Sequence, residues 1–128
     1  MNDGDVSYRQ NLHDLLTLLT GQWTVAIIAT LAVGERRFTD LLAEVNETEA
    51  RLGWISHTKP LSRRVLTDTL RRLEADELVE RRADGEHEQF SKVSYRLSPD
   101  GRALLGMLRP LASWAGQRRV GGVQPDPH

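Results

Sequence analysis

One segment of the chain carries an unusually complete helix signature. Ser62 is a residue type that caps helix N-termini, and Leu61 before it can pack on Leu66 inside the helix. At about 100° per residue, one stripe is fit for burial: Leu66, Thr69, Leu70 and Leu73. The opposite face carries polar side chains: Arg63, Arg64, Thr67, Asp68 and Arg71. The pattern predicts a helix over 62–75 with one face toward a core and the other toward a polar partner.

Two segments after this helix alternate between polar and apolar residues. The first covers 78–82, a polar turn covers 83–91, and the second covers 92–97. In the second segment Val93, Tyr95 and Leu97 alternate with polar residues. Alternation on both sides of a turn that contains Asp84-Gly85 predicts a β-hairpin over about 78–97.

Two helices are expected before this region. The first, over about 8–20, has an apolar stripe at helical spacing made of Leu12, Leu15, Leu16 and Leu19. The second apolar segment, 23–33, also fits a buried strand by periodicity, but its length and the spacing of Trp23, Ile27 and Leu31 favour a buried helix.

A third helix is expected after the extended link Arg36-Arg37-Phe38, with Thr39 as its N-cap. Residues 47–52 can add a further turn to this third helix, and 54–60 is expected to form a loop. The last helix should cover 99–117, because Ser98 can cap it and Pro99 suits its first position. Pro110 is expected to kink that helix or split it in two.

Length and composition restrict the class of protein. The 128 residues fit one domain, expected over 8–117 between flexible ends at 1–7 and 118–128. The absence of cysteine excludes disulfides, a thiolate zinc site and a cysteine nucleophile. No apolar run reaches the roughly 18 residues of a membrane span, so we expect a cytoplasmic protein with no membrane partner.

Positive charge is concentrated in one short segment. The whole chain has a formal net charge of −1, yet residues 59–73 hold five basic residues against one aspartate, a net charge of +4. The rest of the chain is therefore acidic, with −5. A cationic segment within an acidic protein indicates a local surface for an anionic partner.

The order of the expected elements is that of a winged helix-turn-helix: helices, a basic-faced helix, a hairpin and a final helix. The fold class is therefore mainly α with a small β-hairpin. The major groove of B-DNA admits one α-helix, whose exposed side chains reach the base edges. Double-stranded DNA is the expected partner, and 62–75 is the expected recognition helix.

We assign candidate DNA contacts by position. Arg63, Arg64 and Thr67 lie at the start of the recognition helix and are expected near the bases. Asp68 either orients an arginine or accepts from cytosine N4, and Arg71 is expected to hold phosphate. Arg72 projects between the two faces, so a structural role is equally open. Further phosphate candidates stand at helix starts and at the hairpin base: Lys59, Ser62, Thr39, Arg82 and Lys92. For Ser62 and Thr39, capping alone is an open alternative.

A series of short motifs runs through most of the chain. They are, in order, Gly21-Gln22-Trp23-Thr24, Arg36-Arg37-Phe38, Val65-Leu66-Thr67, Leu70-Arg71-Arg72-Leu73-Glu74-Ala75-Asp76, Leu78-Val79-Glu80-Arg81, Tyr95-Arg96-Leu97-Ser98, Gly101-Arg102-Ala103-Leu104-Leu105 and Trp114. Over about 12–115, their order and spacing resemble HxlR-type winged helix-turn-helix transcriptional regulators.

The resemblance implies a homodimer that binds a palindromic operator, with the first and last helices forming much of the dimer interface. The residues expected at that interface, or in an effector pocket near it, are Leu12, Leu15, Leu16, Leu19, Trp23, Leu108, Leu111 and Trp114. For Trp23 and Trp114 a place in the core is equally open.

The chain departs from the family pattern in three ways. Residues 46–60 look like an insertion before the recognition helix. The cysteine through which many members sense electrophiles is absent. The hairpin turn carries Asp84, Glu86 and Glu88, which phosphate would repel.

Other function classes find less support. The sequence has no P-loop, dinucleotide, zinc-protease or nucleophile-elbow motif, and its histidines lack metal-ligand spacing, so no catalytic residue, metal or cofactor is expected. A small-molecule effector between the first, second and last helices is compatible with a regulator. The acidic turn and the net charge leave one alternative, a ligand-binding or protein-interaction module that has lost operator binding.

Overall fold

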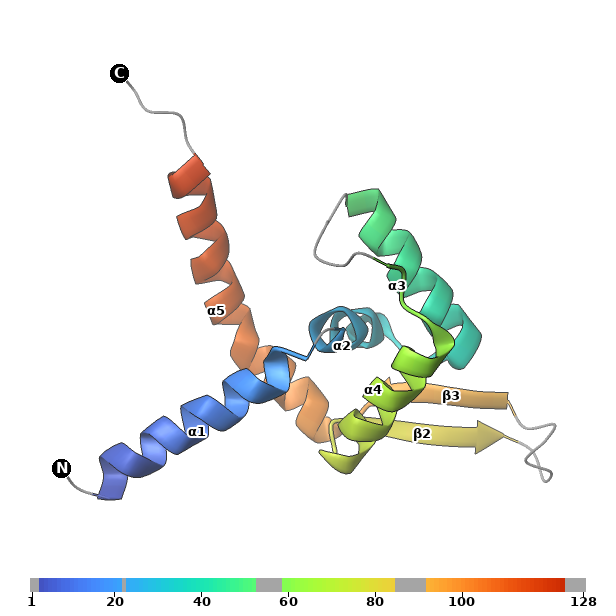
Figure 1. The fold of residues 1–128 in the computed structure, drawn as a ribbon, viewed down its shortest axis with the longest axis horizontal. Coiled ribbons are helices and arrows are strands. Elements are labelled where there is room, and N and C mark those ends of the chain that lie inside the picture. Colours follow the sequence, from blue (N-terminus) through green and yellow to red (C-terminus); the bar gives the residue numbers. More distant parts are fainter. Residues whose placement is uncertain (1–2, 22, 53–58, 85–91, 124–128) are drawn as a thin grey trace.

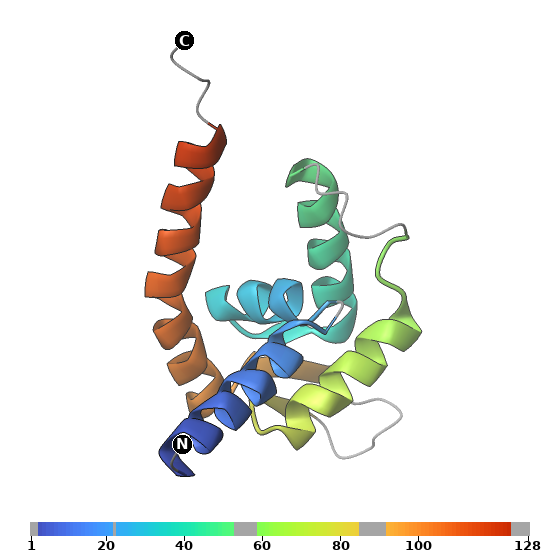
Figure 2. The same ribbon diagram turned by 60° about the vertical axis from the view of Figure 1, so that its left-hand side comes forward.

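The computed structural model describes residues 3–21, 23–52, 59–84 and 92–123. Along these residues the chain forms α1 (Asp3–Leu19), α2 (Thr24–Val33), β1 (Arg36–Arg37), α3 (Phe38–Leu52), α4 (Arg63–Ala75), β2 (Val79–Asp84), β3 (Lys92–Leu97) and α5 (Pro99–Val123). The α2, α3 and α4 helices and the strands form one body, from which α1 and the second half of α5 project (Figures 1 and 2). This is the mainly helical winged-helix architecture that the sequence predicts.

The sheet has one strand more than the predicted hairpin. The β2 and β3 strands pair antiparallel, with Val79 opposite Leu97 and Asp84 opposite Lys92. The link at Arg36–Arg37 forms β1 on the other side of β3, so the strand order is β1-β3-β2. Strand β2 also runs to Asp84, so the expected turn at residues 83–84 is wrong, and 85–91 lie outside the described residues.

The core lies where the apolar stripes of three helices meet the sheet. The predicted stripe of α4 is confirmed, because all four of its residues are buried. They pack with a cluster that includes Ile27 and Leu31 of α2, Leu41 and Val45 of α3, and Leu97 of β3. Segment 24–33 is thus a helix, as its length predicts, with one side buried at Ile27, Ile28 and Leu31. Its other side is exposed at Val25 and Val33. Burying each leucine stabilises by about 1.5–3 kcal/mol, against about 1 kcal/mol for a helix cap, so packing dominates the stability of α4.

The structure confirms two of the predicted helix caps and contradicts a third. The Ser62 hydroxyl accepts a hydrogen bond from the Val65 N–H at 3.1 Å, and the Ser98 hydroxyl accepts one from the Gly101 N–H at 2.9 Å. Thr39 is not an N-cap, because α3 begins at Phe38 and Thr39 lies within its first turn. Pairing with β3 keeps the chain extended to Arg37, so the helix can begin only at the next residue.

The outer helices are longer than the sequence indicates. The α1 helix begins at Asp3, five residues before the expected start, and α5 continues to Val123. Pro110 does not split α5. Pro110 has no N–H to donate to the carbonyl of Gly106, four residues earlier. Both residues are exposed, so water can hydrogen-bond to that carbonyl instead. Among the described residues no single helix is long and apolar enough to span a membrane. Only α1 and α2 taken together reach that length and apolarity, and they are bent by 77° with respect to each other.

Candidate nucleic-acid interface

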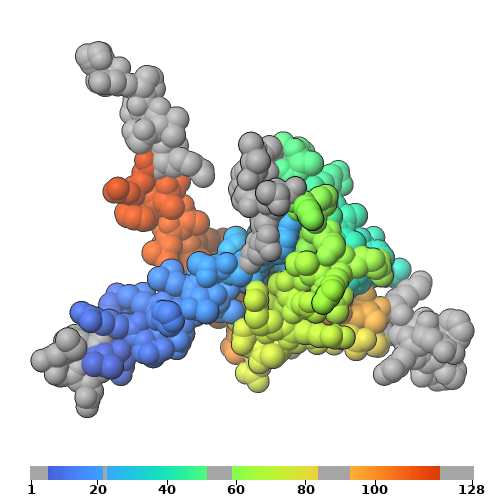
Figure 3. Space-filling view, viewed as in Figure 1, coloured from blue at the N-terminus to red at the C-terminus, as the bar shows by residue number. Residues whose placement is uncertain are grey.

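The polar face of α4 points away from the core. The outermost ridge consists of Arg64, Asp68 and Arg71, which lie directly opposite the buried stripe and are exposed. Figure 3 shows this helix on the near surface of the molecule, in green and yellow. None of the three side chains has an ion-pair partner among the described residues, so the predicted pairing of Asp68 with an arginine of this chain is not seen there.

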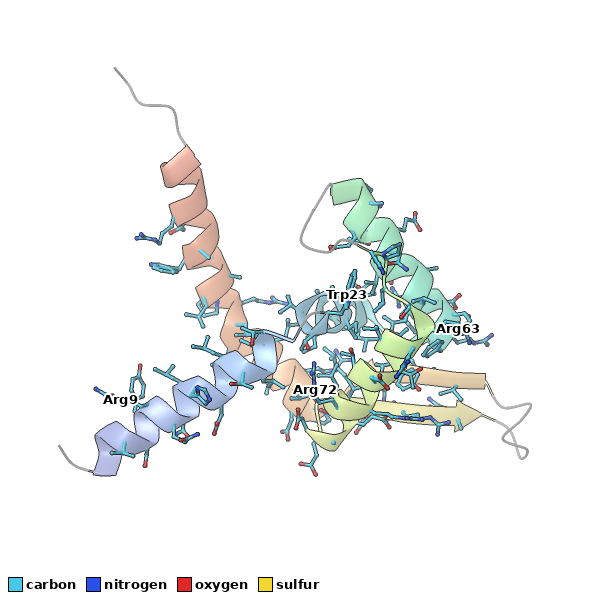
Figure 4. All side chains as sticks on the ribbon, in the orientation of Figure 1. Arg9, Trp23, Arg63 and Arg72 are labelled. Carbon is cyan, nitrogen blue, oxygen red and sulfur yellow. The ribbon has the colours of Figure 1, made fainter. Side chains whose placement is uncertain are left out.

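Arg63 lies to one side of this ridge. Its guanidinium carbon is 5.0 Å from the centroid of the Phe38 ring, a cation–π contact with the first residue of α3. Thr67 lies one turn further along on the same side, and its hydroxyl donates to the Arg63 carbonyl at 2.8 Å. Figure 4 shows Arg63 at the start of α4, beside α3. Arg63 is exposed as predicted, but it faces α3 and the sheet.

A pocket of about 500 Å³ opens between these elements. Its walls include Arg63 and Thr67 from α4, Arg37 from β1, Thr39 from α3 and Arg81 from β2. The sequence analysis missed Arg37 and Arg81 as site residues. They lie far apart in the sequence, and the pairing of β1 and β2 on opposite sides of β3 places both on one sheet.

The expected phosphate contacts at the hairpin base differ from one another. Arg82 is exposed but lies 4.0 Å from a carboxylate oxygen of Glu35. The other oxygen of Glu35 accepts a hydrogen bond from the Ser94 hydroxyl at 2.5 Å. The Lys92 backbone belongs to β3, whereas its side chain and the acidic turn lie outside the described side chains. Lys59 and Ser62 are exposed just before α4.

Arg72 has the structural role that its intermediate position left open. Its Nη2 donates to the Thr24 hydroxyl at 2.8 Å, and Thr24 is buried at the start of α2. Figure 4 shows Arg72 on the side of α4 that faces α2, away from Arg63. The contact ties α4 to the junction of α1 and α2, where Gly21 leaves room for the guanidinium.

The residues expected at a dimer interface fall into three groups by exposure. Leu111 and Trp114 of α5 are 57% and 58% exposed, and Leu12 and Leu16 of α1 are also exposed. Leu15, Leu19 and Leu108 are half-buried. Trp23 is only 4% exposed and belongs to the core cluster, so it is a core residue of the protomer and not an interface residue.

A second pocket, of about 310 Å³, lies between α2 and α3. Its lining includes Ala29, Val33 and Thr48. Small-molecule sites have volumes of roughly 300–1,000 Å³, so this pocket is at the lower end of that range.

Comparisons with known proteins agree with this architecture. A family model described as HxlR-like helix-turn-helix matches residues 18–120. YtcD of Bacillus subtilis strain 168, an uncharacterized HTH-type transcriptional regulator, is 28% identical over 119 residues, which cover 93% of this chain and 82% of YtcD.

Solved structures give the same result. One described as a MarR-family transcriptional regulator from Enterococcus faecalis V583 superposes with a TM-score of 0.72 at 26% identity, over 91% of this chain and 93% of that one. The transcriptional regulator YodB from B. subtilis, in its reduced form, gives a TM-score of 0.62 at 30% identity, over 84% and 90%. The winged-helix architecture and the family match agree, and the chain belongs to the HxlR-like helix-turn-helix family.

Proposed function

We propose that this chain regulates transcription by binding operator DNA as a homodimer, with one α4 helix in the major groove of each half-site. The observation that carries the proposal is the outward face of α4, where exposed arginines stand without ion-pair partners among the described residues. An α-helix with its side chains is about 10–12 Å wide, and the major groove is about 12 Å wide. Helix α4 thus presents a cationic surface and is narrow enough to enter the major groove.

The ridge of α4 has the chemistry to read bases. Arg71 is expected from the sequence to hold phosphate, but it lies on the same outward ridge as Arg64, and we assign both to the bases. Each can donate two hydrogen bonds to O6 and N7 of guanine, and Asp68 can accept from N4 of cytosine. An exposed carboxylate between two arginines would be repelled by phosphate, which favours a place toward the base edges for this ridge. Lys59, Ser62 and Arg82 lie nearer the helix start and the wing, where backbone phosphates pass.

Binding to DNA selected from a random pool tests the function directly. We expect enrichment of a palindrome whose half-site centres are about 10–10.5 base pairs apart, because two-fold symmetry repeats α4 after one turn of DNA. The affinity should fall as salt rises, with a logarithmic slope of about −0.9 for each phosphate neutralised. No enrichment, and no complex with any duplex at low ionic strength, would favour an interaction module that has lost operator binding.

Dimerisation is assigned to α1 and α5. On α5 one stripe begins with Leu104, which packs on the core, and continues outward through Met107, Leu111 and Trp114, all exposed. A monomer rarely leaves such a contiguous apolar stripe in water. The α1 helix adds exposed Leu12 and Leu16. Both helices project from the DNA-binding body (Figure 2), which leaves the α4 face uncovered.

A charge within this stripe should separate the protomers. We expect Leu111→Glu to raise the dimer dissociation constant by about 100-fold or more, because an unpaired charge in an apolar contact costs several kcal/mol. Sedimentation equilibrium measures the change. Ser113→Glu places the same charge on an exposed face of the same helix and should leave the dimer intact. A Leu111→Glu protein that stays dimeric at the wild-type dissociation constant would contradict the assignment.

Regulation by a small molecule extends the proposal. The pocket between α2 and α3 supports it, although the sequence suggested a different place, between the first, second and last helices. Helix α3 contacts β1 and β3 and so adjoins the DNA-binding surface. A ligand shifts a regulator only by binding two of its states with different affinities. Oxidation of a thiol on this chain is excluded as the trigger, since the sequence has no cysteine.

A further inference from the structure

The pocket between α3, α4 and the wing strands holds three arginines from three separate elements. Arg37 comes from β1, Arg63 from α4 and Arg81 from β2, and no carboxylate lines the pocket. Among the described residues none of the three has an ion-pair partner. Like charges that share one concave surface repel each other unless an anion lies between them. The lining is therefore suited to a compact, strongly charged anion.

Arg63 is held toward this pocket. The Phe38 ring lies 5.0 Å from its guanidinium carbon, and Phe38 packs in turn against the Tyr95 ring, with centroids 6.5 Å apart. Arg63 also lies about 100° around α4 from the centre of the ridge formed by Arg64, Asp68 and Arg71. Its side chain thus faces the pocket, while the ridge faces outward.

The start of α3 forms part of the same wall. Phe38 and Thr39 are the first two residues of this 15-residue helix, and both line the pocket. The first N–H groups of a helix lack intrahelical partners and favour negative charge. These N–H groups and the three guanidinium groups can all donate hydrogen bonds to an anion in the pocket.

We infer that this pocket binds one phosphate of the operator backbone, and that Arg63 contacts that phosphate and not a base. The inference rests on the proposed function. It divides the polar face of α4 in two. Arg63 and Thr67 flank the backbone beside the groove, while Arg64, Asp68 and Arg71 read the bases. Phe38 is a positioning residue that sets the direction of Arg63.

The test combines Arg37→Ala with Arg81→Ala and leaves α4 unaltered. We expect the salt dependence of binding to become less steep by about 0.9 per protomer, because one phosphate contact is lost. Affinity should fall by the same factor for the selected operator and for a random duplex, so their ratio stays constant. The matched control, Arg102→Ala with Arg109→Ala, removes the same charge from exposed positions on α5 and should leave the slope unchanged.

Neutral phosphate analogues locate the contact. A methylphosphonate placed at successive positions of the operator should weaken wild-type binding at several phosphates. At one of these in each half-site, the Arg37→Ala, Arg81→Ala protein should show no further loss. If both proteins lose the same factor at every position, the pocket takes a free anion or none, and the inference is overturned. A fall in the ratio of operator to random affinity would overturn it as well.

Phe38→Leu tests the positioning role, since leucine keeps the apolar packing and removes the aromatic face. We expect a loss of about two- to fivefold on operator and random duplex alike, the range of an exposed cation–π contact. Unchanged affinity for both duplexes would show that Phe38 does not position Arg63.

The two proposals also fail in different ways. A wild-type protein without affinity for DNA ends both, whereas wild-type binding with unaltered slopes in the pocket variant ends only this one.

Discussion

Alanine at Arg64 is expected to lower affinity for the operator by about 30-fold to 10⁴-fold, while affinity for a random duplex falls much less. Arg64 is exposed at the start of α4 and lies on the ridge directly opposite the buried stripe. A bidentate contact to guanine discriminates by about 1–3 kcal/mol, and a homodimer makes the contact twice. Titration of both duplexes at one salt concentration measures the two affinities.

Lysine at the same position separates charge from geometry. Arg64→Lys keeps the positive charge but has no planar fork of donors, so we expect a loss of specificity with the salt dependence unchanged. Arg102→Ala removes an exposed arginine from α5 and should alter neither quantity. Equal losses on operator and random duplex for Arg64→Ala would place Arg64 on the backbone and leave base reading to Asp68 and Arg71.

The features that the sequence predicts correctly are local ones. The α4 helix has a cap at Ser62 and a leucine stripe within one segment, and both signals agree, so its bounds and buried face follow from a few neighbouring residues. The start of α5 is equally well marked by Ser98 and Pro99. The exposed ridge follows from the buried stripe, because a helix must present its other side to solvent.

The features that the sequence does not reveal depend on distant pairings. Two residues are too few to indicate a strand, so β1 exists only because β3 offers it an edge. The pocket arginines then meet through that sheet, and no spacing rule connects Arg37 with Arg81. Thr39 looks like a cap until the extended β1 moves the helix start to Phe38. Pro110 stops most helices, but here an exposed carbonyl can be hydrated.

Gly101 marks a close contact between the DNA-binding body and α5. It is buried, and a Cβ built on it would lie 2.2 Å from the carbonyl oxygen of Leu78. That oxygen cannot turn away freely, because it already accepts a hydrogen bond from the Ser98 N–H at 3.0 Å. The Ser98 hydroxyl also donates to the carbonyl of Glu77 at 2.6 Å. Glu77 itself has a φ of 61°, so the backbone here has little freedom to adjust.

Gly101→Ala should therefore reduce the free energy of unfolding by about 1–3 kcal/mol, the cost of overpacking a close-packed site. Gly106→Ala makes the same change in the same helix, at an exposed position where nothing lies within 4 Å of the added Cβ. Alanine there should raise stability by about 0.5–1 kcal/mol, since glycine is the poorer helix former. Urea denaturation of the two variants should thus shift in opposite directions. A shift of Gly101→Ala to higher urea concentration, as for Gly106→Ala, would mean that the start of α5 can move away from Leu78, and α5 would then not be rigidly joined to the body that carries α4.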